Sequence, residues 1–139
     1  MKRRTIRILS IDDDHGCQRA AAQFLTLVGG HQVEVAYNGG DGIKKALEIR
    51  PDAILLDLVM PDMDGGQVLV ALYNECSTRD IPVFMLTGAD LEASARSALY
   101  LNKNLKSIDQ KPASFQELML RIESAVSTRT YPMQAALPE

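Results

Sequence analysis

Short apolar runs alternate with helical patterns along this 139-residue chain, and this alternation constrains the fold more than any other feature. Three runs are strand-length and rich in aliphatic residues: 6–11, 53–56 and 81–86. Continuous runs of this kind indicate strands that are covered on both faces. Two more polar runs, Gln32–Ala36 and Leu105–Gln110, suit strands at the edges of a sheet.

Five stretches with apolar residues at helical spacing follow these runs in turn. They cover residues 17–28, 43–47, 68–76, 91–99 and 115–126. Gly29 and Gly30 predict the end of the first helix, and Ser114 with Glu117 predicts a capping box that opens the last one. Five strands alternating with five helices predict an α/β fold, a flavodoxin-like doubly wound parallel sheet with strand order 2-1-3-4-5.

The length fits one domain, which we expect over residues 1–126, followed by a C-terminal tail at 127–139 and no output domain. A net charge of -3 argues against nucleic acid as a partner, and the basic residues 2–4 indicate only a solvated arm. No run is long enough for a signal peptide or a membrane span. We therefore expect a cytoplasmic protein without a membrane partner.

The cysteines and histidines do not form a metal-ligand pattern. Cys17 and Cys76 lie on the apolar stripes of expected helices, which predicts buried free thiols. His15 opens the first helix and His31 lies in a loop, so solvated surface positions are expected for both.

Aspartates end two of the apolar strands. Asp12, Asp13 and Asp14 follow the first strand, and Asp57 ends the third. Strands one and three are neighbours at the switch point of the expected sheet, so Asp12, Asp13 and Asp57 should converge. Carboxylates without His or Cys suit Mg²⁺ better than zinc. The alternative is that these acids only cap helices and face water, and a cap is the role expected of Asp14.

The fourth and fifth strands end in groups that could bind an anion. Thr87 offers a hydroxyl, Gly88 a backbone N–H, and Lys111 an ammonium. A carboxylate can attack phosphorus, and the oxygens of the incoming group then need cations and hydrogen-bond donors. This pattern predicts a phosphoryl-acceptor site centred on Asp57.

The residues at these strand ends resemble the response-regulator receiver family over residues 6–126. The resemblance is carried by Asp12-Asp13, by the segment ILLDLVMPDMDG at 54–65, by Thr87-Gly88 and by Lys111-Pro112. It implies two-component signalling, in which the domain catalyses only its own phosphorylation and dephosphorylation and is otherwise not an enzyme.

The resemblance also implies a role for each site residue. Asp57 is the phosphoryl acceptor, while Thr87 and Lys111 bind the phosphoryl oxygens, and the Lys111–Pro112 bond is cis. The implied Mg²⁺ ligands are the side chains of Asp12, Asp13 and Asp57 and the backbone carbonyl of Val59. Asp12 would act mainly through metal-bound water.

The implied partners are a sensor histidine kinase or phosphotransfer protein and an unknown downstream protein. A phosphorylation-dependent homodimer is expected through the face made by the fourth helix, fifth strand and fifth helix. Three features depart from the family: Ile108 stands where the switch aromatic belongs, residues 100–107 lack the Gly-Ala turn and are slightly longer, and Gly88 replaces alanine. The first two fall on the partner-binding face.

Two other functions remain as alternatives. A phosphatase of the haloacid-dehalogenase type also uses a strand-end aspartate, but it needs a second acid at the position of Val59. A degenerate receiver that acts only as a protein-interaction module would not need the complete set of acids, threonine and lysine.

Overall fold

The fold is a five-stranded parallel sheet with helices on both faces. The computed structural model describes the backbone of residues 5–136 and the side chains of residues 5–127. The strands are β1 (Arg7–Ile11), β2 (Gln32–Ala36), β3 (Ala53–Asp57), β4 (Val83–Thr87) and β5 (Leu105–Gln110). All pairs are parallel and the order is β2-β1-β3-β4-β5, which confirms the predicted topology.

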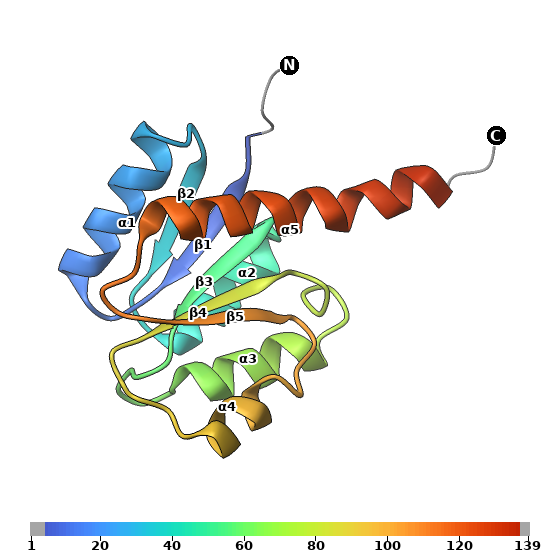
Figure 1. Ribbon diagram of the computed structural model, residues 1–139. Coiled ribbons are helices and arrows are strands. Elements are labelled where there is room, and N and C mark those ends of the chain that lie inside the picture. Colours follow the sequence, from blue (N-terminus) through green and yellow to red (C-terminus); the bar gives the residue numbers. More distant parts are fainter. Residues whose placement is uncertain (1–4, 137–139) are drawn as a thin grey trace.

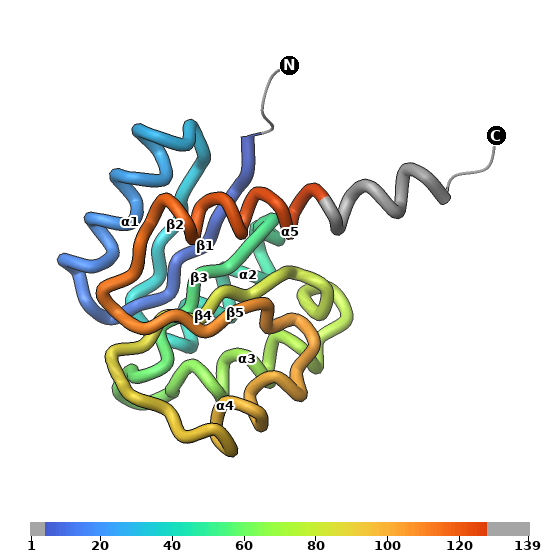
Figure 2. Tube along the Cα trace, in the orientation of Figure 1, coloured from blue at the N-terminus to red at the C-terminus, as the bar shows by residue number. Residues whose placement is uncertain are grey.

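The five helices form two layers (Figure 1). One face carries α1 (His15–Leu27) and α5 (Phe115–Ala136), and the other carries α2 (Gly39–Ile49), α3 (Gly65–Asn74) and α4 (Ala93–Leu99). In the Cα trace, the loops that follow the strands all turn at the same edge of the sheet, on the left of the view (Figure 2).

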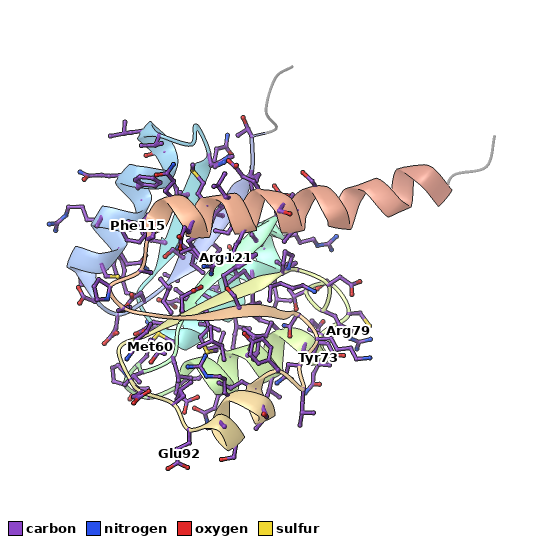
Figure 3. The ribbon with its side chains drawn as sticks, viewed as in Figure 1. Met60, Tyr73, Arg79, Glu92, Phe115 and Arg121 are labelled. Carbon is purple, nitrogen blue, oxygen red and sulfur yellow. The ribbon has the colours of Figure 1, made fainter. Side chains whose placement is uncertain are left out.

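Side chains alternate between the two faces of each strand and so build two apolar clusters. Leu9 and Leu56 pack with α2, α3 and α4 on one face. Ile8 and Leu55 pack with α1 and α5 on the other. Phe115 lies at the start of α5 (Figure 3), and its ring centroid is 6.0 Å from that of Phe24 on α1.

Local signals in the sequence explain where two helices begin or end. Asp14 is the N-cap of α1, and its side chain accepts a hydrogen bond from the backbone N–H of Cys17 at 3.0 Å. Gly30, at φ 71°, follows the end of the same helix. At the start of α5, the Ser114 hydroxyl accepts from the N–H of Glu117 at 3.3 Å.

The ends of several elements differ from the expected ones. β4 begins at Val83 rather than at residue 81, although Ile81 and Pro82 are buried in the loop before it. The last helix was expected to end near Val126, but α5 continues to Ala136. Loss of the apolar stripe does not stop a helix by itself, and no glycine follows to do so. The domain boundary at residue 126 stays a prediction, and the basic residues 2–4 lie outside the described residues.

The burial of three residues was predicted wrongly. Both cysteines are free, but Cys17 is half-buried and Cys76 is exposed, since α3 ends at Asn74 before the stripe reaches Cys76. His31 is buried rather than solvated. Its Nδ1 accepts from the N–H of Ile6 at 3.1 Å, and its Nε2 lies 2.6 Å from Glu123 of α5. His15 is exposed as expected and stacks on Tyr37.

Within residues 5–136, no helix combines the length and the apolar character that crossing a membrane requires.

Candidate functional site

The candidate site lies at the carboxyl ends of four neighbouring strands. Asp12 and Asp13 follow β1, Asp57 ends β3, Thr87 ends β4, and Lys111 follows β5. In a doubly wound sheet the crevice opens where the strand order reverses, which here is between β1 and β3. The topology therefore brings residues that are up to 99 positions apart to one edge of the sheet.

Three carboxylates converge at this edge. One oxygen of each of Asp12, Asp13 and Asp57 lies within 4.8 Å of the others. Asp12 and Asp57 are buried, at 5% and 6% exposure, while Asp13 faces solvent. Burial and the neighbouring charge of Asp12 raise the pKa of Asp57 to about 6, although Lys111 acts in the opposite direction. The cluster is an electrostatic cost to the fold that a cation would relieve.

Lys111 supplies one positive charge to the cluster. Its Nζ lies 3.0 Å from Asp12 Oδ2 and 3.3 Å from Asp57 Oδ1. Burial disfavours the ammonium, but its hydrogen bond to Asp12 and the charges of both acids outweigh this and raise the pKa of Lys111. The Lys111–Pro112 peptide bond is cis, as expected. Lys111 also donates its backbone N–H to the carbonyl of Thr87 at 2.8 Å, which ties the lysine to the end of β4.

Thr87 lies at the end of the interior strand β4 and is 1% exposed. Its hydroxyl accepts a hydrogen bond from the N–H of Ala89 at 3.0 Å. At the next residue, Gly88, an added Cβ would meet no atom within 4 Å. The hydroxyl at the end of β4 is thus held by a hydrogen bond from the loop that follows, and the first residue of that loop, Gly88, has open space where a side chain would lie.

The loop after Asp57 is fixed by close backbone packing. The N–H of Gly65 donates to the carbonyl of Leu58 at 2.7 Å, and a Cβ at Gly65 would come within 2.4 Å of the carbonyl oxygen of Asp57. Asp62 adopts a left-handed conformation at φ 70°, and Asp64 forms a reciprocal capping box with Gln67. Val59 lies in this loop and is 62% exposed.

The donor set fits a hard divalent cation. All three converging side chains offer carboxylate oxygens, and this cluster contains no His or Cys. One side of the cluster is open to solvent at Asp13, which leaves room for the water molecules that Mg²⁺ retains.

Sequence reasoning missed one residue at this edge of the sheet. Gln18 of α1 is 2% exposed, and its side-chain nitrogen donates to backbone carbonyls at the ends of β1 and β2. Its only signal in the sequence is a polar residue within the apolar stripe of α1, and this does not indicate that backbone carbonyls from two strands converge on it.

Comparison with known protein families identifies the family to which the chain belongs. The model of the response regulator receiver domain matches residues 8–123. The chain belongs to this family.

Relatives of this receiver domain are found among both sequences and solved structures. Response regulator MprA of Mycobacterium leprae (strain TN) is 34% identical over 131 residues, which cover 94% of this chain and 55% of that protein. A protein-glutamate methylesterase/protein-glutamine glutaminase of Archaeoglobus fulgidus is 32% identical over 88% of this chain and 37% of its own length. The chain thus spans about half or less of these curated relatives.

The solved structures show the same receiver fold. A CheY-like response regulator receiver domain protein from Methanospirillum hungatei JF-1 has a TM-score of 0.81 at 25% identity, covering 91% of this chain and 98% of that one. The receiver domain of a LuxO repressor protein from Vibrio parahaemolyticus reaches 0.84 at 19% identity, covering 97% and 100%. As a response regulator receiver, this domain belongs to two-component signalling, where such domains contact histidine kinases and downstream effectors.

Proposed function

We propose that this receiver domain takes a phosphoryl group from a phosphohistidine of a sensor kinase or phosphotransfer protein onto Asp57. The observation that carries the proposal is the position of Asp57 in a carboxylate cluster within 4.8 Å, with the ammonium of Lys111 3.3 Å from its oxygen. A nucleophilic carboxylate needs this combination of a cation-binding cluster and a fixed positive charge, because both reagents are anionic.

Asp12, Asp13 and Asp57, with the backbone carbonyl of Val59, would hold Mg²⁺, Asp12 mainly through water. The bound ion supplies positive charge that reduces repulsion between the carboxylate and the phosphoryl oxygens. Asp57 has a pKa of about 6 even without this charge, so it is largely ionised near pH 7.5 and available as a nucleophile.

In the transfer, an oxygen of Asp57 forms a bond to phosphorus while the bond from phosphorus to the histidine nitrogen breaks. The electron pair of that broken bond returns to the imidazole of the donor. Lys111 pairs with an oxygen of the transferred group, and Thr87 donates its hydroxyl to another once it leaves its contact with Ala89. The protein thereby positions the group and compensates its charge.

The new group changes the contacts of Lys111 and Thr87, which gives the two states of the domain different energies. We propose that this shift alters binding to a downstream protein, or a homodimer through the face of α4, β5 and α5. Ile108 of β5 is buried on that side of the sheet, where the family carries an aromatic switch residue. The signal would then depend on Thr87 and the loops around it rather than on an exchanging ring.

The test is phosphorylation by acetyl phosphate, followed by intact mass and phosphate-affinity gel shift. We expect one added phosphoryl group with Mg²⁺, none with excess EDTA, and none in Asp57→Asn. Asp62→Asn is the control, since Asp62 is exposed on the same loop and its left-handed backbone also suits asparagine. Labelling of Asp57→Asn to the wild-type level would refute the assignment of the acceptor. Turnover of a small phosphate ester would instead favour a phosphatase.

A further inference from the structure

Gln18 is a buried polar residue on α1 that neither the sequence pattern nor the proposed transfer step accounts for. Its side-chain nitrogen lies 2.9 Å from the carbonyl oxygen of Ser10, 3.2 Å from that of Asp12, and 2.9 Å from that of Ala36. The residue is 2% exposed. Two N–H groups therefore serve three convergent backbone acceptors inside the protein.

These three carbonyls belong to the segments that set the position of the acidic cluster. Ser10 and Asp12 lie at the end of β1, and Ala36 ends β2. The same carbonyl of Ala36 also accepts the backbone N–H of Asp12 at 3.1 Å. Through these hydrogen bonds, Gln18 links the backbone that bears Asp12 and Asp13 to α1 and to the neighbouring strand β2.

The other end of the amide shows which property of Gln18 is used. Its Oε1 is buried, and among the described residues it has no hydrogen-bond partner. A buried acceptor without a partner costs free energy, and the stabilisation from the three hydrogen bonds of the side-chain nitrogen must outweigh that cost. The residue is held in place for its donors.

The backbone after β1 needs such a restraint because it carries like charges. Asp12 and Asp13 face Asp57 across the crevice, and their mutual repulsion favours any movement that separates them. A hydrogen-bonding partner behind a metal ligand fixes its orientation and tunes its affinity. The hydrogen bonds of Gln18 act on the backbone of Asp12, not on its carboxylate, so they leave the carboxylate oxygens available.

We propose that Gln18 is a positioning residue that holds the strand end bearing Asp12 and Asp13 in the geometry that binds a divalent cation. This inference rests on the proposed function, since it concerns the Mg²⁺ that supports phosphoryl transfer.

Three variants separate positioning from simple support of the fold. Gln18→Met keeps an unbranched side chain of similar length but removes the donors. Gln18→Arg returns N–H donors to the same place. Gln23→Met is the matched control, because Gln23 lies on the same helix and is exposed.

Isothermal titration with Mg²⁺, at a temperature where each variant is folded, measures affinity directly. We expect the Kd of Gln18→Met to rise about 10-fold or more and that of Gln18→Arg to recover to within about threefold of wild type, as for other groups that support metal ligands. Gln23→Met should leave the Kd unchanged. A purely structural role would lower the unfolding temperature of Gln18→Met in EDTA without changing its Kd, and this result would overturn the inference.

The outcomes also separate this inference from the proposed function. Wild-type protein that binds no Mg²⁺ would overturn both, whereas equal Mg²⁺ affinity in wild type and Gln18→Met would overturn the positioning role alone. If Gln18→Met does not fold, NMR of the wild type decides. The side-chain N–H₂ signals of Gln18 should be protected from exchange and should shift on Mg²⁺ addition, and signals that do neither refute the proposal.

Discussion

Replacing Asp57 by asparagine should stabilise the fold in the absence of divalent cations. The pKa of Asp57 is about 6 in the folded protein, because burial and the charge of Asp12 disfavour its ionised form. In the unfolded chain an aspartate titrates near 4. Between about pH 4 and 6 the folded state therefore binds more protons than the unfolded state, so the free energy of unfolding falls as the pH rises through this window.

The size of the effect follows from the pKa difference. About two units at 1.36 kcal/mol per unit give a penalty of about 3 kcal/mol for the ionised form, which is complete above about pH 6.5. Solvent that reaches the crevice screens part of it, so we expect Asp57→Asn to gain about 1–3 kcal/mol at pH 7.5. Lys111 keeps Asp12 as a partner at 3.0 Å in the variant, so its ammonium is not left unpaired.

Urea unfolding in EDTA, followed by circular dichroism, measures this gain. The gain should be present at pH 7.5, nearly absent at pH 4, and reduced by saturating Mg²⁺, which on the proposed function would stabilise the wild type by binding its folded state. Asp80→Asn removes the same formal charge from an exposed loop and should change stability by less than about 0.5 kcal/mol. An Asp57→Asn protein that is no more stable than wild type at pH 7.5, or one whose gain persists at pH 4, would refute the electrostatic reasoning.

Three further predictions concern residues around Asp57. Gly65→Ala should lower the free energy of unfolding in urea by about 1–3 kcal/mol, because the new Cβ would press on the carbonyl of Asp57. Gly88→Ala is the control: its Cβ would meet nothing within 4 Å, so its free energy of unfolding should be within about 1 kcal/mol of that of the wild type. Lys111→Met should raise the pKa of Asp57 above about 6 in a ¹³C NMR titration in EDTA, and an unchanged titration would show that the ammonium does not act on it. Val59 is exposed and apolar, so it cannot orient an attacking water, and the aspartyl phosphate should decay slowly. Val59→Asn should speed this decay, as followed on a phosphate-affinity gel. A phosphoryl lifetime of only seconds in the wild type would contradict this reasoning.

The sheet and the acidic site could be predicted because both depend on the order of elements along the chain. Once buried runs are placed in the middle of a parallel sheet, the residues after them must meet at one edge, whatever the details of packing. Asp12, Asp13 and Asp57 were therefore expected together, and they lie within 4.8 Å. Lys111 followed from the same reasoning, with its Nζ 3.0 Å from Asp12.

Contacts made by buried polar side chains could not be predicted in this way. His31 looks like a loop residue in the sequence, but it is buried between Ile6 and Glu123, 92 positions away from the latter. Gln18 interrupts an apolar stripe, and only three-dimensional structure shows that carbonyls from two strands converge on it. The spacing of apolar residues predicts which face of a helix is buried, but it does not predict which hydrogen-bond acceptors that face will meet.

The ion pairs of Lys111 with Asp12 and Asp57 set the charge balance of the crevice. In formal charges, the three carboxylates and one ammonium leave two negative charges, which a single Mg²⁺ would neutralise. An aspartyl phosphate carries nearly two charges where the carboxylate of Asp57 carried one, so the phosphorylated crevice holds an uncompensated negative charge. On the proposed function, this excess negative charge attracts further N–H and O–H groups into the crevice. The charges of the Mg²⁺-bound crevice would therefore balance in the unphosphorylated domain but not in the phosphorylated one.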